Sequence, residues 1–168
     1  MSVTLREYDP SDFEALYALD RACYPPGISY SRRTLKWFLA LPGAVCLVAQ
    51  SSEETKDILG FIIAEADEGD AHGIFGEMGG HIITIDIAES SRRSGVGTAL
   101  LRETEQRLAA RGVSRVTLET ATANEPAVAF WRRHGYRTHG VLPGYYLGRL
   151  DAYSMSKPLA PVGGPETR

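Results

Sequence analysis

Residues 90–101, SSRRSGVGTALL, place two arginines, a serine and two glycines directly before an amphipathic helical run. The N-terminus of a helix carries backbone N–H groups without intrahelical partners and a partial positive charge. Small residues let several such amides converge on one anion, and Gly95 and Gly97 allow the backbone to approach it closely. The stretch therefore forms either a glycine-softened turn with solvated arginines or a phosphate or diphosphate site, to which Arg92 and Arg93 add charge.

Two familiar nucleotide-binding loops do not match this stretch. The phosphate loop of nucleoside triphosphatases ends in Gly-Lys-[Ser/Thr], and no lysine occurs here. The dinucleotide fingerprint G-x-G-x-x-G fails at its third glycine, which is Leu100. Its glycines also follow the preceding strand at once, whereas residues 90–94 separate the strand from Gly95. On the residues alone, the turn and the anion site both stay open.

The apolar pattern around the loop predicts an α/β or α+β chain. Runs of strand length alternate with stretches of helical spacing, and Pro, Gly or Ser residues separate them. Strands are expected over residues 3–8, 44–50, 58–66, 81–89, 114–121, 135–142 and 150–159, and helices within 9–24, 31–41, 96–111 and 124–134. The order is a hairpin or meander followed by β-α-β-α-β-β, which predicts a mixed sheet. Residues 143–149 are expected to form the last turn.

Length and composition predict one globular domain over residues 1–159, followed by a disordered Pro- and Gly-rich tail over 160–168. The net charge of −3 argues against a general nucleic-acid binder. No stretch approaches the ~20 apolar residues of a membrane-spanning helix, and the first residues lack the apolar core of a signal peptide. We therefore expect a cytoplasmic protein without membrane or nucleic-acid partners, in which Cys23 and Cys46 are reduced thiols.

The loop and its flanks resemble one family. Arg92-x-x-Gly95-x-Gly97, after ITIDIAE and before TALL, resembles the acyl-coenzyme A loop of the GNAT N-acetyltransferase superfamily. The stretch over 112–137, GVSRVTLETATANEPAVAFWRRHGYR, is similar to that family's next strand and helix. The likeness is good over 81–159 and looser before it. It implies the GNAT fold: a mixed, mostly antiparallel sheet of six to seven strands flanked by about four helices.

The resemblance also implies acetyl-coenzyme A as the cofactor, and no metal. In the family, the loop amides bind the coenzyme A diphosphate, which here assigns Arg92, Arg93, Ser94, Gly95, Val96, Gly97 and Thr98. The preceding strand binds the pantetheine arm, which implicates Ile85 and Ile87. Asn124 matches an asparagine near the cofactor. Its position before Pro126 also predicts a helix N-cap, and the two roles are compatible.

Three further stretches resemble the family branch that acetylates N-terminal amines, which includes bacterial ribosomal-protein-alanine acetyltransferases. They are CYPPGISY at 23–30, HIITI at 81–85 and HGVLPGYYLGRLDAYSM at 139–155. In that branch the first and last stretches wall a slot for a peptide N-terminus. The residues assigned to the slot here are Tyr24, Tyr30, Tyr145 and Tyr146. From the residues alone, ordinary half-buried packing is the alternative explanation for these tyrosines.

Glu119 and His81 are the candidate catalytic groups. Strand alternation turns Glu119 away from the apolar Leu118, and the branch often carries a catalytic glutamate or histidine there. His81 matches a position where some members have a catalytic tyrosine, and an imidazole there relays a proton through water. The alternatives are an exposed strand carboxylate and a strand-end histidine without a role. Neutralising an α-amine of pKa ~8 at pH 7 costs only about 1.4 kcal/mol, against about 4.6 kcal/mol for lysine, so a weak base suffices.

Trp131 departs from the family pattern, which has a tyrosine there that protonates the leaving thiolate. An indole N–H donates a hydrogen bond but no proton in this pH range. Either Trp131 polarises the sulfur as part of the cofactor site, or another tyrosine or water acts, or the protein is slow or inactive. A thiolate of pKa ~8.5 gains only about 2 kcal/mol from protonation at pH 7.

The sequence is compatible with three functions. The first is acetylation of the N-terminal α-amine of a protein or peptide, by direct attack on the thioester with water-mediated base catalysis. The second keeps the cofactor and takes a small-molecule amine or a lysine side chain, which the acidic stretch 65–77 favours. The third is a non-catalytic acyl-coenzyme A regulatory module, which Trp131 keeps open. A monomer and a homodimer are both compatible with the sequence.

Overall fold

The computed structural model describes residues 2–67 and 78–161. Most of the acidic stretch 65–77 and of the predicted tail 160–168 lies outside these residues. The chain forms two compact units. The first comprises Met1–Glu65 and Ile82–Thr104, and the second comprises Ala66–His81 and Glu105–Arg168. The boundaries between the units fall within β3, β4 and α3.

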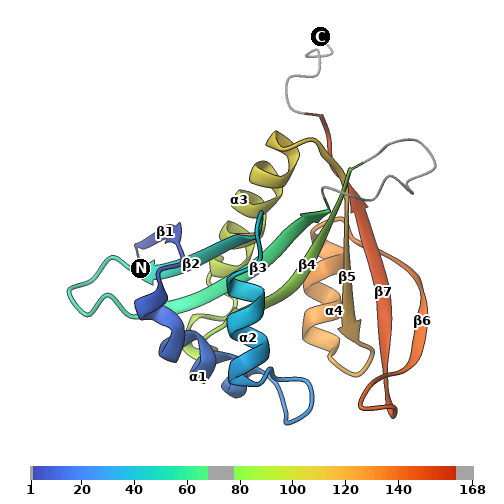
Figure 1. Cartoon of the computed structure of the whole chain (residues 1–168), viewed down its shortest axis with the longest axis horizontal. Coiled ribbons are helices and arrows are strands. Elements are labelled where there is room, and N and C mark those ends of the chain that lie inside the picture. Colours follow the sequence, from blue (N-terminus) through green and yellow to red (C-terminus); the bar gives the residue numbers. More distant parts are fainter. Residues whose placement is uncertain (1, 68–77, 162–168) are drawn as a thin grey trace. The chain divides into compact units, whose positions relative to one another are not determined.

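Seven strands form the sheet in the order β1-β2-β3-β4-β5-β7-β6 (Figure 1). β4 pairs with β5 in parallel, while β1/β2, β2/β3, β5/β7 and β6/β7 are antiparallel. The bounds are β1 (Val3–Glu7), β2 (Val45–Ser51), β3 (Ile58–Asp67), β4 (Met78–Ile87), β5 (Val113–Ala121), β6 (Arg137–Tyr146), β7 (Leu150–Pro158), α1 (Phe13–Cys23), α2 (Arg32–Leu39), α3 (Val96–Ala110) and α4 (Glu125–Arg133). The predicted mixed, mostly antiparallel sheet with four helices is confirmed.

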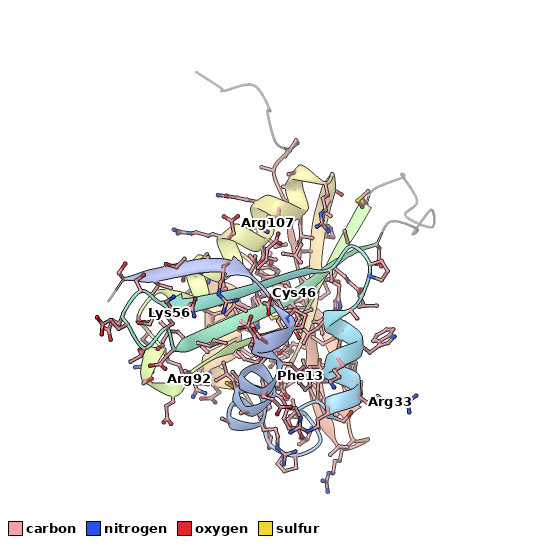
Figure 2. The ribbon with its side chains drawn as sticks, turned by 60° about the vertical axis from the view of Figure 1, so that its left-hand side comes forward. Phe13, Arg33, Cys46, Lys56, Arg92 and Arg107 are labelled. Atoms are coloured by element: carbon pink, nitrogen blue, oxygen red, sulfur yellow. The ribbon has the colours of Figure 1, made fainter. Side chains whose placement is uncertain are left out.

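The core of the first unit lies between its two N-terminal helices and the sheet. Both helices have local start signals: a 3-10 turn capped by the Asp9 side chain precedes α1, and the Ser31 hydroxyl accepts the amide of Thr34 at the start of α2. Phe13 and Cys46, both labelled in Figure 2, belong to this packing. The buried members are Phe13, Leu16, Leu35, Val48, Phe61 and Ile63.

The second unit packs α4 against β5, β7 pairs with β5, and β6 pairs with β7 (Figure 1). Tyr136 is fully buried, and its hydroxyl donates to Oε1 of Glu105 at 3.0 Å. Nζ of Lys157 donates to the same carboxylate at 2.9 and 3.1 Å, so this partly buried carboxylate keeps a counter-charge. Gly112 follows the end of α3 with φ +93°, a conformation typical of the glycine that ends a helix.

The predicted turn over 143–149 is wrong in its first half. β6 continues to Tyr146, and the turn is confined to residues 147–149. The strand accommodates Pro143 because the pairing with β7 shifts register between Leu142 and Tyr146, and Gly144 takes up the irregularity at φ +63°. The Asp151 side chain accepts the amide of Gly144 at 2.9 Å, which fixes this bulge.

The described residues also bear on the cysteines, on membrane-spanning helices and on metal ligands. Cys23 and Cys46 are free thiols, as predicted. Among residues 2–67 and 78–161, no helix is long and apolar enough to cross a membrane. The same residues hold no group of three or more His, Cys, Asp or Glu side chains placed to bind a metal ion.

Gly60 marks a close approach of β3 to the end of β4. A β-carbon at this position would lie 2.7 Å from the carbonyl oxygen of Asp86 and 2.7 Å from Cδ1 of Ile87. We expect Gly60→Ala to lower the free energy of unfolding by about 2 kcal/mol, since backbone must move to admit the methyl group. Urea denaturation followed by circular dichroism measures this change.

Gly140→Ala is the matched control for Gly60→Ala. Gly140 also lies in a strand, and a β-carbon there meets no atom within 4 Å. The expected change in unfolding free energy is within about 0.5 kcal/mol. Equal losses in the two variants would show that the contact with β4 is not what makes Gly60 necessary.

Candidate active site

The predicted anion loop leads directly into α3. Arg93 has φ +59° and Gly95 has φ +88°, and alternating left-handed residues of this kind turn successive amides toward one point. The amide of Ala99 donates to the carbonyl of Gly95 at 3.0 Å, which starts the helix. The amides of Val96 and Gly97 precede that bond, so they have no acceptor within the helix itself. A β-carbon on Gly95 would meet no atom within 4 Å, so the space beside the loop backbone is open.

Arg92 binds the main chain at the end of β4. Its Nε donates to the carbonyl of Ile87 at 3.2 Å, and its Nη2 donates to Sγ of Cys23 at 3.8 Å. Ser94 donates its hydroxyl to the carbonyl of Ser91. Arg92, labelled in Figure 2, therefore positions the loop through its guanidinium. Arg93 and Ser94 are exposed, as a residue that meets a soluble ligand must be.

Three carbonyls along one edge of β4 accept hydrogen bonds from side chains of the first unit, to which this part of β4 also belongs. The hydroxyl of Tyr24 donates to Ile85 at 2.9 Å, and that of Tyr30 donates to Ile83 at 3.3 Å. Ile87 accepts from Cys23 at 3.4 Å as well as from Arg92. The N–H and C=O of one strand residue point to the same side, so the amides of Ile85 and Ile87 face this edge too.

Tyr24 and Tyr30, assigned to the acceptor slot, are both half-buried. Their hydroxyls hold segment 24–30 against β4 by hydrogen bonds, so both tyrosines have a structural role. Burial, with the nearby Asp86 carboxyl, raises the pKa of Tyr24 well above its ordinary value. Tyr24 therefore stays a neutral hydrogen-bond donor at neutral pH.

His81 and Glu119 meet in the second unit. The parallel register of β4 and β5 runs from Met78/Val113 to His81/Thr117, and Glu119 lies two residues beyond Thr117 on the same face of β5. Nε2 of His81 and Oε2 of Glu119 are 2.6 Å apart, a hydrogen bond in which the carboxylate accepts. The two side chains are 30% and 24% exposed, so both remain open to solvent. Each residue was predicted separately, and the structure joins them.

Tyr145 and Tyr146 pack edge to face, with ring centroids 4.9 Å apart. Tyr145 is 49% exposed. Burial, followed by the Glu119 charge, raises the pKa of Tyr145. Burial, then Tyr145 and Glu119, raises the pKa of Tyr146 to about 12. The field of Glu119 thus reaches both tyrosines, and the structure groups His81, Glu119, Tyr145 and Tyr146 in one unit.

The two predicted cofactor residues of α4 have structural partners. Oδ1 of Asn124 accepts the amide of Ala127 at 3.3 Å, so the predicted N-cap is confirmed, with Pro126 in the first turn. Trp131 is 5% exposed and packs edge to face on Tyr136 at 5.2 Å between ring centroids. Trp131 is therefore part of the core of the second unit. Contact of Asn124 and Trp131 with a cofactor stays a prediction.

Residues 13–136 match the Acetyltransferase (GNAT) family. The chain belongs to this family. Among curated relatives, an N-alpha-acetyltransferase of Sulfurisphaera tokodaii is 36% identical over 81 residues, which is 48% of each chain. The chain thus matches about half the length of this relative. An uncharacterised N-acetyltransferase of Methanocaldococcus jannaschii is 26% identical over 162 residues, 96% of this chain and 95% of the relative.

Solved structures with the GNAT fold are also similar. The ribosomal-protein-S18-alanine N-acetyltransferase of Escherichia coli has a TM-score of 0.78 at 21% identity, and the match covers 99% of both chains. The Arabidopsis thaliana NAA60 in complex with acetyl-CoA has a TM-score of 0.80 at 21% identity, covering 97% of this chain and 100% of the other. At these identities the similarity establishes the shared fold.

Two buried carboxyls of this GNAT protein were not predicted. Asp20 in α1 is completely buried, and Asp86 in β4 is 1% exposed. Their signal in the sequence is a single acid inside an otherwise apolar run, as in IITIDIA, where a buried charge needs a partner. The partner lies on an element distant in the chain, so no local spacing reveals it.

Proposed function

We propose that this GNAT protein transfers an acetyl group from acetyl-coenzyme A to the N-terminal α-amine of a protein or peptide. The observation that supports this most is the hydrogen bond between His81 and Glu119, two partly exposed side chains that can act together as a general base. Such a pair suits an amine of pKa ~8 better than a lysine side chain of pKa ~10.4. The relatives named N-alpha-acetyltransferase agree with this acceptor.

The loop fits the donor. Left-handed residues at 93 and 95, open space at the Gly95 backbone and the first amides of α3 form a cradle of the kind that binds a diphosphate. The loop residues 92–98 would hold the diphosphate, and the edge amides of Ile85 and Ile87 would hold the pantetheine arm. Acetyl-coenzyme A supplies the acetyl group as an activated thioester. NAA60, which shares the fold, was solved with acetyl-CoA.

Glu119, held by His81, removes one proton from the acceptor amine. The Glu119 carboxylate accepts a proton from the α-ammonium group, directly or through one water, and leaves a neutral amine as the nucleophile. The His81 N–H that donates to Oε2 of Glu119 fixes the carboxylate and shares the charge change. Neutralising the α-amine at pH 7 costs only about 1.4 kcal/mol, so a weak base is sufficient.

The leaving group needs little help from α4. The buried Trp131 indole donates a hydrogen bond at most, and protonating a thiolate of pKa ~8.5 contributes only about 2 kcal/mol at pH 7. Tyr146, whose pKa is about 12, remains a neutral hydroxyl donor at this pH. We assign Tyr145 and Tyr146 to the wall that contacts the acceptor backbone.

A peptide panel tests the acceptor. Peptides that differ in the first residue are incubated with the protein and acetyl-coenzyme A, and free thiol release and product mass are measured. We expect acetylation of free α-amines and none of the same lysine-containing peptides with blocked N-termini. Rapid acetylation of blocked peptides or of a polyamine would assign the second acceptor class. Tight coenzyme A binding without transfer to any amine would indicate a regulatory module.

A further inference from the structure

Two aspartates of the first unit share a completely buried environment that the acetyl-transfer chemistry does not use. Asp20 on α1 accepts the amide of Tyr30 through Oδ2 at 2.6 Å. Asp86 on β4 accepts the hydroxyl of Thr84 through Oδ1 at 2.7 Å. Each aspartate is thus bound by one donor through one oxygen.

The second carboxyl oxygen of each aspartate indicates that the two groups share a proton. Oδ1 of Asp20 and Oδ2 of Asp86 are buried and have no donor when both groups are written as carboxylates. The end of α1 lies against this part of β4, since Sγ of Cys23 donates to the carbonyl of Ile87 at 3.4 Å and the Tyr24 hydroxyl donates to that of Ile85 at 2.9 Å, and each carboxyl group affects the pKa of the other. One proton placed between them satisfies both oxygens, whereas two adjacent buried carboxylates without a cation repel each other.

The surroundings assign that proton to Asp86. Burial raises the pKa of Asp20 as well, but Asp20 accepts a hydrogen bond from the Tyr30 amide and lies in the field of Arg21, and both of these favour its charged form. Asp86 is next to Cys23 and Tyr24, neither of which is cationic, and Arg92 reaches only as far as the Cys23 sulfur. Burial, followed by the Asp20 charge, raises the pKa of Asp86 well above its ordinary value. Asp86 therefore donates through Oδ2–H to the Asp20 carboxylate.

We propose that this shared proton holds segment 24–30 in place on β4 and makes Asp20 a positioning residue for that segment. Asp20 fixes the Tyr30 amide, while the Tyr24 and Tyr30 hydroxyls fasten the same segment to Ile85 and Ile83 of β4. The inference rests on the proposed function in one respect: segment 24–30 is taken as a wall of the acceptor slot.

Replacing each aspartate with asparagine gives different results under this proposal. In Asp86→Asn the amide N–H takes the place of the shared proton, so we expect the peptide KM to stay within about threefold of wild type. In Asp20→Asn the charged acceptor of the Tyr30 amide is lost, and we expect the peptide KM to rise about tenfold while kcat changes less than about threefold. Asp57→Asn, in an exposed turn, controls for loss of one negative charge. Equal KM changes in the two buried variants would overturn the proposal.

The pH dependence of stability tests the shared proton without any turnover. Between the ordinary aspartate pKa of ~3.9 and the raised pKa of Asp86, the folded protein holds a proton that the unfolded chain has released. Wild-type stability therefore falls as pH rises through this window, and Asp86→Asn lacks this contribution. In this window we expect the Tm difference between Asp86→Asn and wild type to shift in favour of the variant by about 3 °C for each pH unit of increase. The Tm difference between Asp57→Asn and wild type should not change with pH there.

Hydrogen exchange completes the test. The Tyr30 amide should be protected in wild type and in Asp86→Asn, and should exchange at least about tenfold faster in Asp20→Asn. A parallel Tm profile for Asp86→Asn and wild type overturns the shared proton, even if Asp20→Asn does not fold. Absence of peptide acetylation in wild type, with the Tm and exchange results as expected, would instead refute the proposed function and leave the shared proton standing.

Discussion

Gly95→Asp is expected to weaken coenzyme A binding by at least about 100-fold. A side chain at φ +88° costs about 1–2 kcal/mol, and one negative charge about 4 Å from a phosphate adds repulsion of comparable or larger size. Near a protein surface this repulsion is about 4 kcal/mol, so the sum exceeds the 2.7 kcal/mol that corresponds to about 100-fold in affinity. Titration calorimetry with coenzyme A measures the dissociation constant without turnover. Gly95→Ala, which brings the backbone strain alone, should lose about tenfold.

Gly112→Asp separates ligand binding from backbone strain. Gly112 has φ +93°, and a β-carbon there also meets no atom within 4 Å, but the residue follows the end of α3 and lies outside the loop. This variant should lose about 1–2 kcal/mol of stability and keep its affinity for coenzyme A within about twofold. If Gly95→Asp binds coenzyme A within threefold of wild type, the loop does not hold the diphosphate and the donor assignment fails.

Local signals account for the parts of the fold that the sequence predicted well. Ser31 and Asn124 cap helices because their side chains reach amides three residues ahead, and Gly112 ends α3 because it accepts a positive φ. The turn that leads into α3 is of the same kind, since its glycines and the helix that follows are adjacent in the chain, while its binding of an anion stays a prediction. Residue type and short spacing were sufficient for these features.

The missed features depend on strand register and on burial. Pro143-Gly144 is a turn signal by composition, yet pairing with β7 and the Asp151 side chain extend β6 through it. The Asp20–Asp86 pair joins α1 to β4, and the His81–Glu119 bond depends on which residue of β4 pairs with Thr117. A shift of one residue would turn Glu119 to the other face, and composition does not determine that register.

Glu119→Gln is expected to lower kcat for a peptide acceptor at pH 7 by about 10²–10³, with little change in the affinity for coenzyme A. The amide keeps a hydrogen-bond acceptor for His81 but cannot accept a proton, so only the base function is removed. The defect should shrink as pH rises above the α-amine pKa of ~8, where the acceptor is already neutral. Steady-state kinetics from pH 6 to pH 10 give both results. Glu125→Gln, an exposed carboxyl at the start of α4, is the matched control.

The partnership of the two residues is measured by adding His81→Gln. If His81 acts by fixing and sharing charge with Glu119, the single variants lower kcat by related amounts, and the double variant is little slower than Glu119→Gln alone. Independent roles would instead multiply the two losses. Retention of kcat within threefold in Glu119→Gln at pH 7 would reduce the 2.6 Å bond to a structural contact between β4 and β5 and require the base to be sought elsewhere. The non-additive result, together with rescue at high pH, is what a shared proton acceptor predicts and what a contact that only orders the two strands does not.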